Sequence, residues 1–188
     1  MTLTVIPIRS FRGMSRLSDD LDVEARSLLM SRLAAGTVAA ARSAGTDVAI
    51  VTGDPDVGRW AEEVNIAVIR EPVAGGLGAA ARAGVAAANG RRWLVLHADL
   101  PLLGPPDVAA VIGAAADGFA LAPSHDGGTS AIAGRSGDFP FRYGPGSFQR
   151  HFAAIGGNAV VVARLGFGAD VDRPADLEWL RVLDAVAR

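Results

Sequence analysis

The amino-acid sequence predicts an α/β fold with a mainly parallel sheet and helices on both faces. Short apolar runs, typical of strands buried on both sides, alternate with longer segments in which leucine and alanine recur at helical spacing. Strand–helix alternation of this kind is typical of parallel sheets. The residues are 50% apolar and 20% charged, as in globular proteins. The chain contains no internal repeat or low-complexity linker, and we expect residues 1–188 to form a single domain.

The first half of the chain contains predicted strands that are each followed by a predicted helix. The strands cover residues 2–8, 47–52 and 66–70. The helices cover residues 22–43, 57–63 and an alanine-rich stretch that ends near Asn89. A polar loop with several arginines, residues 9–21, precedes the first helix. Gly45 is expected to end that helix, because glycine readily adopts the left-handed conformation that follows a helix. The residues Gly53-Asp54-Pro55-Asp56 predict a turn after the second strand.

The second half of the chain continues the alternation. Its predicted strands cover residues 92–98, 119–122, 129–133 and 159–165. Its predicted helices cover residues 105–116, a stretch that begins at Ser147 and another that begins near Pro174. Together with the first half, these elements predict a single-domain, Rossmann-like three-layer sandwich. In such folds ligands bind at the carboxyl ends of the strands, near the point where the strand order reverses.

The composition excludes several classes of function. The absence of cysteine excludes a disulfide framework, a thiol nucleophile and a thiolate metal site. The N-terminus lacks the basic-then-apolar order of a signal peptide, and no apolar run approaches the ~20 residues of a membrane span. A formal net charge of -2 gives no general attraction for nucleic acid. We therefore expect a cytoplasmic protein that binds neither nucleic acid nor membrane, and the sequence gives no indication of its oligomeric state.

The strongest motif is a continuous apolar strand that ends in an aspartate, Trp93-Leu94-Val95-Leu96-His97-Ala98-Asp99-Leu100-Pro101-Leu102. Pro101 prevents the strand from continuing. A carboxylate at the end of a strand is well placed to bind Mg²⁺, which prefers oxygen ligands. The same pattern also fits an aspartate that only caps a helix or closes a turn.

A second acidic motif, Asp170-Val171-Asp172-Arg173-Pro174-Ala175-Asp176-Leu177, lies near the C-terminus. In an extended segment Asp170 and Asp172 lie on the same side, because side chains alternate along a strand. We expect one of them to face the site and the other to cap the helix that begins near Pro174. Two acidic groups at strand ends suit a divalent-metal site for phosphoryl chemistry, in which the metal neutralises a triphosphate.

A third motif is rich in glycine, Phe141-Arg142-Tyr143-Gly144-Pro145-Gly146-Ser147-Phe148-Gln149-Arg150-His151. Its glycines permit close approach to the backbone, and Ser147 is expected as the N-cap of the next helix. Free amides at a helix start, with Arg142 and Arg150 nearby, would suit a phosphate or a carboxylate. A structural turn followed by a cap is the alternative interpretation.

Two other glycine-rich loops give weaker indications. Asp126-Gly127-Gly128-Thr129-Ser130 precedes a strand and has the same two interpretations. Gly75-Gly76-Leu77-Gly78 matches neither the Walker pattern nor the dinucleotide fingerprint, which argues against an ATPase or a dehydrogenase.

The histidines show no metal-ligand spacing and no serine or cysteine partner in a nucleophile motif. His97 is expected to have a structural role in the core. His151 follows Ser147 by four residues, so the two lie on one face of the predicted helix, and His151 is the histidine most closely linked to the site.

Taken together, these stretches resemble the 2-phospho-L-lactate and phosphoenolpyruvate guanylyltransferases of coenzyme F-420 biosynthesis, a family within the Rossmann-like nucleotidyltransferases. The matching segments run in the family's order across nearly the whole chain. They are residues 6–8 with 15–17, 97–102, 127–131, 141–148 with His151, and 170–177. The acidic segments are shared with many nucleotidyltransferases, including the molybdenum-cofactor guanylyltransferases. The Phe-x-x-Gly-Pro-Gly-Ser-Phe-x-x-His segment is much more specific.

The resemblance implies the fold type of nucleotide-diphospho-sugar transferases and a reaction. In that reaction GTP and a phosphorylated three-carbon acid, phosphoenolpyruvate or 2-phospho-L-lactate, give a guanylylated acid and pyrophosphate. The product would be passed to the next transferase of the pathway.

The resemblance also implies roles for individual residues. Mg²⁺ would be held by Asp99 and Asp170, with Asp172 as the alternative second ligand. The acid would be contacted by Thr129, Gly144, Ser147 and His151. The nucleotide would be contacted by Arg9, Arg12, Arg16, Gly76 and Gly78. Asp99 and Arg16 would be the catalytic residues.

The chain departs from the family at a few positions. Met14 stands where the family usually has a lysine, and all 18 basic residues of this chain are arginine. Gly78 and Ser130 stand where asparagine is common. Two alternatives follow: transfer to another phosphorylated small molecule, such as a molybdopterin, or a non-catalytic relative that binds nucleotide. Met14 and Gly78 favour the non-catalytic relative, and the retained acidic motifs argue against it.

Overall fold

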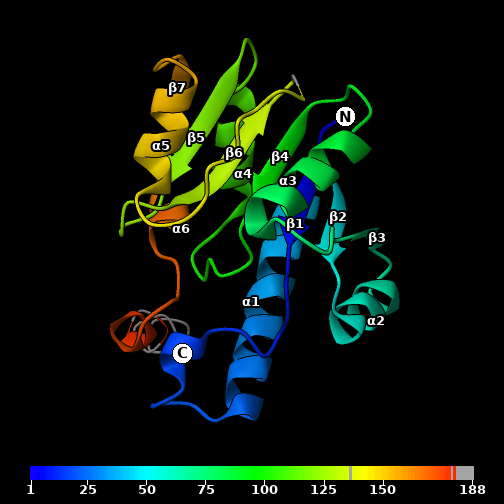
Figure 1. Ribbon diagram of the computed structural model, residues 1–188, viewed down its shortest axis with the longest axis vertical. Coiled ribbons are helices and arrows are strands. Elements are labelled where there is room, and N and C mark those ends of the chain that lie inside the picture. Colours follow the sequence, from blue (N-terminus) through cyan, green and yellow to red (C-terminus); the bar gives the residue numbers. More distant parts are fainter. Residues whose placement is uncertain (136, 179, 181–188) are drawn as a thin grey trace.

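In the computed structural model, which describes residues 1–135, 137–178 and 180, one mixed sheet forms the centre of the molecule (Figure 1). Its strands are β1 (Leu3–Pro7), β2 (Asp47–Thr52), β3 (Ala67–Arg70), β4 (Trp93–Leu96), β5 (Phe119–Pro123), β6 (Thr129–Gly134) and β7 (Ala159–Val161). The strand order is β3-β2-β1-β4-β6-β5-β7. β6 is antiparallel to both of its neighbours, and the other strand pairs are parallel.

The helices cover both faces of the sheet and complete a three-layer sandwich. They are α1 (Val23–Ser43), α2 (Pro55–Glu63), α3 (Gly76–Ala87), α4 (Pro105–Ala114), α5 (Ser147–Ala154) and α6 (Leu165–Gly168), with 3-10 turns η1 (Ser15–Leu17) and η2 (Pro174–Asp176). Apolar residues of α1, α2, α4 and α6 form one core layer, and those of α3 and α5 form the other. Figure 1 shows α3 and α5 in front of the sheet and α4 behind it. The predicted fold class is confirmed.

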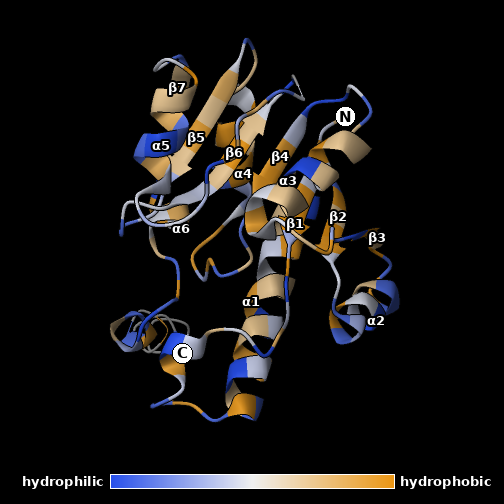
Figure 2. Ribbon diagram, viewed as in Figure 1, coloured by the Kyte–Doolittle hydropathy of each residue, from blue (hydrophilic) through white to orange (hydrophobic). Residues whose placement is uncertain are grey.

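The strands are apolar on both sides because both sides are covered, as Figure 2 shows by their colour. Neighbouring residues of β1 illustrate this, since Ile6 belongs to the layer under α1 and Val5 to the layer under α3. The approach of α3 is especially close: a Cβ added at Gly84 would lie 2.0 Å from Cγ1 of Val5. Glycine at this position therefore lets α3 lie directly on β1.

The ends of α1 follow the sequence. The side chain of Asp22 caps its first turn by accepting a hydrogen bond from the amide of Ala25 at 2.7 Å. Gly45, with a φ of 79°, follows the helix in the left-handed conformation predicted for it. No helix of the described residues is both long and apolar enough to cross a membrane.

Three local predictions were wrong. The strand predicted over 159–165 ends at Val161, and Leu165 begins α6 instead. Ser147 is not an N-cap: Gly146, at a φ of 65°, holds that position, and Ser147 is the first residue of α5. Neither Asp170 nor Asp172 caps the C-terminal turn.

That C-terminal cap is formed by a different acid. The side chain of Asp176 accepts hydrogen bonds from the amides of Asp172 and Arg173 at 2.9 and 2.7 Å, and η2 begins with Pro174. The end of the helix predicted from Pro174 lies outside the described residues.

The strand order reverses between β1 and β4. The chain passes from β1 through β2 to β3 on one side, and then returns to place β4 on the other side of β1. In open α/β sheets the carboxyl ends of the strands at such a reversal form the ligand-binding crevice. The loops after Pro7 and after Leu96 are therefore the first places to look for a site.

Candidate active site

Two carboxylates lie together beyond the end of β4. The backbone N–H of Val171 donates to the carbonyl oxygen of Asp99 at 3.0 Å, which holds the segment with Asp170 against the loop after β4. Oδ1 of Asp99 is buried and has no hydrogen-bond partner among the described residues. The structure thus brings together two of the acids that the sequence selected, although 71 residues separate them in the chain.

The surroundings of these carboxylates disfavour their charged forms. Burial, reinforced by the negative charges of Asp172 and Asp126, raises the pKa of Asp99 to about 6. Burial also raises the pKa of Asp170, and the charge of Asp99 adds to this effect. A cation between the two groups would relieve this repulsion. A buried carboxylate oxygen without a partner, beside a second carboxylate, fits the oxygen-ligand chemistry of Mg²⁺.

The third acid predicted for a metal, Asp172, is engaged differently. Its carboxylate forms a hydrogen-bonded ion pair with the guanidinium of Arg16. No group of three or more His, Asp or Glu side chains placed to hold a metal occurs within residues 1–135, 137–178 and 180. Mg²⁺ commonly uses only one or two carboxylates, with substrate phosphates completing its coordination.

His125 is a neighbour of this acidic group that the sequence did not indicate. Its Nδ1 lies 3.0 Å from Oδ1 of Asp170, and its Nε2 lies 3.6 Å from Oδ1 of Asp176. Burial alone would lower the pKa of His125, but the hydrogen bond and charge of Asp170 outweigh it and raise that pKa. Only the pairing of two distant segments reveals this contact, because nothing in the spacing of the histidines predicts it.

Met14 lies beside the acidic group without a polar role. It adopts a left-handed backbone conformation with a φ of 54° and precedes η1. Its side chain packs against an apolar cluster that includes Leu17, Leu33 and Val171. The methionine therefore helps to join η1 and α1 to the segment that positions Asp170.

A chain of hydrogen bonds connects three of the residues assigned to the acid. Oγ1 of Thr129 lies 3.1 Å from Oγ of Ser147 and 3.0 Å from Nδ1 of His151. All three side chains are buried. The backbone N–H of Arg142 donates to Nε2 of His151 at 2.7 Å. Because Nε2 accepts this bond, the neutral imidazole carries its proton on Nδ1 and donates it to Thr129.

The environment of His151 keeps it neutral. Burial, with smaller contributions from Arg150, His97 and Arg142, lowers the pKa of His151 to about 4. The imidazole therefore acts as a fixed connector between α5, β6 and the loop that contains Arg142. The sequence placed Ser147 and His151 on one helical face, and the structure confirms that arrangement and adds Thr129 to it.

Gly144 lies in the same loop and requires glycine for two reasons. Its φ is 116°, in the region that disfavours side chains. An added Cβ would also lie 2.9 Å from NH2 of Arg150, so the guanidinium of Arg150 lies directly over the backbone of Gly144. The loop thus presents backbone groups with a cation beside them, which suits an anionic ligand.

Aromatic side chains pack the segment before Gly144 against β4. The ring centroids of Phe139 and Phe141 lie 6.2 and 5.9 Å from that of Trp93 at the start of β4. The centroid of Tyr143 lies 5.4 Å from that of His97 at the end of β4. The segment from Phe139 to Tyr143 therefore follows β4 from its amino end to its carboxyl end.

His97 is partly in the core, as its motif predicted, and partly at the site. Burial lowers its pKa to about 4, and its Nε2 is buried without a partner among the described residues. Yet His97 also lines a cavity of ≈ 210 Å³, together with Arg9 and Asp99. This cavity lies between β1, β4, α1 and α3, at the reversal of the strand order. The ring is therefore part of the wall of the site as well as of the core.

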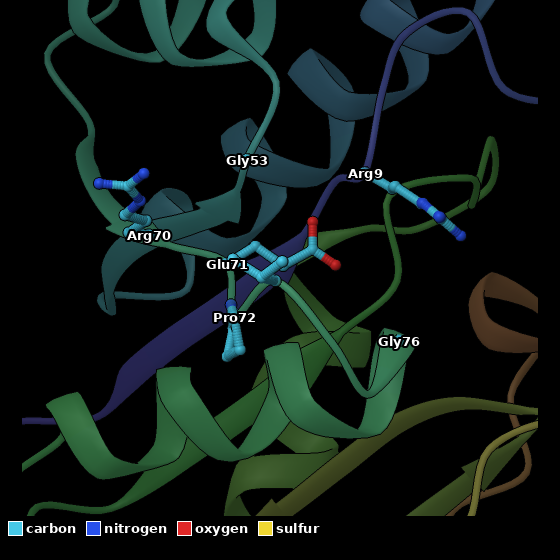
Figure 3. Close-up of a pocket in the computed structure, with 7 residues that line it drawn as sticks. Arg9, Gly53, Arg70, Glu71, Pro72 and Gly76 are labelled. Atoms are coloured by element: carbon cyan, nitrogen blue, oxygen red, sulfur yellow. The ribbon is translucent and has the colours of Figure 1, made fainter.

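A second cavity, of ≈ 280 Å³, adjoins the first at Arg9, which lines both. It lies at the carboxyl ends of β1, β2 and β3 and at the start of α3, and Figure 3 shows its lining. Its lining residues are Arg9, Gly53, Arg70, Glu71, Pro72, Val73 and Gly76. The structure thus brings Arg9 and Gly76, both predicted to contact the nucleotide, to one cavity.

Two other residues assigned to the nucleotide lie around these cavities without lining them. The guanidinium of Arg12 is 3.9 Å from the carboxylate of Asp56 at the start of α2, and its side chain is largely exposed. Gly78 lies in the first turn of α3, where an added Cβ would be 3.6 Å from the carbonyl oxygen of Phe141. Gly78 therefore lies where α3 meets the loop assigned to the acid. Ser130, the other departure from the family, donates its hydroxyl to the carbonyl of Phe167 at 2.7 Å.

Comparison with known proteins gives consistent results. The family described as "Guanylyl transferase CofC like" matches residues 2–180. A phosphoenolpyruvate guanylyltransferase of Rubrobacter xylanophilus is 36% identical over 194 residues, which cover 97% of this chain and 94% of that protein. One from Rhodococcus erythropolis is 33% identical over 203 residues, covering 95% and 89%. A solved structure from Desulfovibrio desulfuricans, of a proposed nucleotide-diphospho-sugar transferase, superposes with a TM-score of 0.79 at 17% identity, covering 95% of this chain and 85% of that one.

Proposed function

This chain belongs to the family of CofC-like guanylyl transferases, and on that premise we propose that it transfers GMP from GTP to phosphoenolpyruvate and releases pyrophosphate. Three relatives that are 33–36% identical over 82–97% of this chain carry the name phosphoenolpyruvate guanylyltransferase. The observation that carries the proposal is the pair of carboxylates at the reversal of the strand order. A backbone hydrogen bond holds Asp99 and Asp170 together, although burial and the repulsion between negative charges disfavour the ionised forms of their carboxylates.

Such a pair suits a reaction in which negative charge accumulates. Bound Mg²⁺, held by Asp99 and Asp170, would supply the neutralisation of the triphosphate that these carboxylates cannot provide themselves. Asp172 is the alternative second ligand, although Arg16 already occupies its carboxylate. The fit rests on Oδ1 of Asp99, a buried acceptor that has no hydrogen-bond partner in the described part of the chain.

The remaining residues position the two substrates. The phosphate of the acid attacks the α-phosphorus of GTP, the bond from that phosphorus to the bridging oxygen breaks, and pyrophosphate leaves. No covalent enzyme intermediate is needed, so positioning and charge neutralisation supply the catalysis. Arg9 lies where the two cavities meet and would contact the triphosphate, and Arg16, beside Asp172, would neutralise charge from the opposite side.

The acid would bind beside β6 and the start of α5, whereas the triphosphate would lie near Arg9. The backbone of Thr129, Gly144 and Ser147 would contact its phosphate and carboxylate, and His151 would hold that backbone in place. The side chains of Thr129, Ser147 and His151 are buried and bonded to one another, which favours contact through amides. The guanidinium of Arg150, over Gly144, would add a positive charge at this position.

The departures from the family fit this scheme. Met14 replaces a lysine, but it fills the apolar cluster beneath Asp170, and Arg16 supplies a cation two residues later. Gly78 leaves room beside the carbonyl of Phe141. Within coenzyme F-420 biosynthesis, which the family resemblance implies, the guanylylated product would be passed to the next transferase.

The proposal is tested by measuring pyrophosphate release with Mg²⁺, GTP and either phosphoenolpyruvate or 2-phospho-L-lactate, with the next transferase and its deazaflavin acceptor present. We expect release that needs both substrates, is greatest with phosphoenolpyruvate and is lost in Asp99→Asn. Asp117→Asn, which changes an exposed acid on the opposite edge of the sheet, is the matched control. Release with another phosphorylated acceptor only would indicate a different transferase. Nucleotide binding without release under any condition would indicate a non-catalytic relative.

A further inference from the structure

The cavity of ≈ 280 Å³ contains a carboxylate that the proposed reaction does not use, that of Glu71. Arg9 and Arg70 line the same cavity, but no hydrogen bond or ion pair connects either of them, or any other described side chain, to this carboxylate. Figure 3 shows the carboxylate of Glu71 directed into the cavity, with both guanidinium groups pointing away from it. This carboxylate, which has no donor among the residues that the structure describes, is therefore available to a ligand.

The backbone holds Glu71 in this position. Its N–H donates to the carbonyl oxygen of Thr52 at 2.9 Å, which continues the pairing of β2 with β3 by one residue. Pro72 follows, so the chain leaves the sheet at this point. Gly53 follows the neighbouring strand β2, and a Cβ added there would lie 3.8 Å from both Cβ and Oε2 of Glu71. The two residues therefore line adjacent parts of the same cavity.

The chemistry of the bases shows which one a carboxylate would select here. Guanine presents two adjacent donors, N1–H and the N2 amino group, beside its O6 acceptor. A carboxylate accepts from two donors at once. Adenine and cytosine place a ring-nitrogen lone pair in the corresponding position, and uracil has a single donor between two carbonyl oxygens. Each of these bases would bring a lone pair against the negative charge, so only guanine matches.

The start of α3 adds the complementary group. The first amides of a helix have no acceptor within the helix, and Gly76, the first residue of α3, lines the cavity. An amide donor beside a carboxylate matches the acceptor-donor-donor order along the edge of guanine. Arg9, which also lines the cavity next to Asp99, would contact the other end of the nucleotide. A triphosphate extending from the base past Arg9 would therefore reach the two carboxylates.

We propose that Glu71 selects guanine by accepting hydrogen bonds from N1–H and from the N2 amino group of the nucleotide. This inference rests on the proposed function for the orientation of the nucleotide. It adds a residue that determines base specificity, on a strand end that none of the sequence motifs included.

The test compares nucleotides that differ by one donor. Equilibrium binding of GTP, inosine triphosphate and ATP, each with Mg²⁺, is measured on the wild type, Glu71→Gln and Glu63→Gln. Inosine triphosphate retains N1–H and O6 but lacks the N2 amino group. The amide of glutamine has one acceptor where the carboxylate has two, and Glu63 is an exposed acid on α2 that serves as the matched control.

We expect the wild type to bind GTP about 10-fold more tightly than inosine triphosphate, the usual size of one charge-assisted hydrogen bond. ATP should bind more weakly than either. Glu71→Gln should lose about 10- to 100-fold in affinity for GTP and less for inosine triphosphate, so that the two bind about equally. Retained binding of inosine triphosphate shows that the cavity of the variant is intact. Glu63→Gln should behave as the wild type.

An unchanged ratio of the two affinities in Glu71→Gln would overturn the inference, and so would a wild type that binds GTP and inosine triphosphate equally. Because the readout is binding, failure of base selection is distinguishable from failure of the proposed transfer. A wild type that selects GTP through Glu71 but never releases pyrophosphate would refute the transfer alone. A wild type that releases pyrophosphate with equal efficiency from both nucleotides would refute the role of Glu71 alone.

Discussion

The backbone N–H of Val171 donates to the carbonyl oxygen of Asp99 at 3.0 Å. This bond joins a loop after β4 to a segment near the C-terminus, and it does so without using either carboxylate. The side chains of Asp99 and Asp170 are therefore brought together by groups that a substitution of the side chains leaves in place. The arrangement allows the charges of the site to be changed one at a time.

The first prediction concerns the stability of Asp99→Asn. Because burial raises the pKa of Asp99 to about 6, its ionised form destabilises the fold at pH 8. We expect the variant, without Mg²⁺, to melt about 2–4 °C higher than the wild type, which corresponds to roughly 1 kcal/mol for a domain of this size. Thermal unfolding followed by circular dichroism measures this. Mg²⁺ should raise the melting temperature of the wild type and of Asp117→Asn but not that of Asp99→Asn, and equal stabilisation of all three would contradict the prediction.

The second prediction concerns the ion pair between Arg16 and Asp172. Both side chains are partly exposed, so breaking the pair should change the free energy of unfolding by no more than about 1 kcal/mol. The effect on transfer should be larger: Arg16→Ala should lower kcat/KM for GTP about 10-fold or more, because a phosphate-neutralising charge is lost. Asp172→Asn should have a smaller effect, and the double variant should be no worse than Arg16→Ala.

Steady-state kinetics of the four proteins measure this coupling. Arg59→Ala, which breaks an exposed ion pair with Asp56 on α2, is the control and should leave kcat/KM unchanged. Strictly additive losses in the double variant would show that the two residues act independently.

The third prediction concerns pH and His151. The unfolded chain binds a proton at this residue near the ordinary pKa of 6.5, whereas the folded protein resists protonation until about 4. Between these values the unfolded state binds more protons, so the free energy of unfolding should fall as the pH is lowered from 6.5 to 4. His97 acts in the same direction and Asp99 in the opposite one, so the contribution of His151 is obtained by comparison with a variant.

His151→Gln provides that comparison. At pH 7 it should be less stable by about 1–3 kcal/mol, because Thr129 and the amide of Arg142 lose well-placed partners. Its stability should decline less steeply than that of the wild type below pH 6.5. Urea unfolding at several pH values measures both curves, and parallel curves would show that His151 does not titrate as described.

The fourth prediction concerns Gly144. Gly144→Ala places a side chain at a φ of 116° and against Arg150, and should destabilise the fold by about 1–3 kcal/mol. It should also raise KM for the acid more than KM for GTP. Gly113→Ala, in α4 and with no atom within 4 Å of the added Cβ, should be neutral or stabilising by up to about 1 kcal/mol. If the alanine at 144 left KM for the acid unchanged, this loop would have no part in binding it.

Much of the fold could be predicted because it depends on local patterns. Apolar runs buried on both sides identified the strands, and Gly45 marked the end of α1 through its backbone freedom. Asp99 could be selected because an acid at the end of an apolar strand is well placed to bind a cation. Asp170 follows α6 rather than a strand, so its position beside Asp99 depends on the hydrogen bond from Val171 to the carbonyl oxygen of Asp99.

The remaining features depend on contacts between segments that the sequence does not pair. Ser147 looked like a cap, but its hydroxyl is bonded to Thr129, and Gly146 takes the cap position through its own backbone conformation. Asp176, rather than Asp170 or Asp172, caps the C-terminal turn, because the chain turns so that the carboxylate of Asp176 reaches the amide of Asp172, four residues earlier. No sequence motif included Glu71. Its place in the cavity depends on its pairing with β2 and on the position of the start of α3, which lie in different parts of the sequence.

The antiparallel direction of β6 has a consequence for how such an enzyme can change. Because β6 is antiparallel to β4, it ends at the side of the sheet opposite the carboxylates. The chain then returns along β4, where the aromatic residues from Phe139 to Tyr143 pack, and reaches Gly144 beside the site. Residues assigned to the nucleotide thus come from the first hundred residues, and those assigned to the acid come from residues 129–151. On these assignments, the two recognition tasks would be encoded in consecutive and non-overlapping stretches of the gene. Variation confined to the second stretch would then be expected to change the preferred acid and to leave the selection of the nucleotide unchanged.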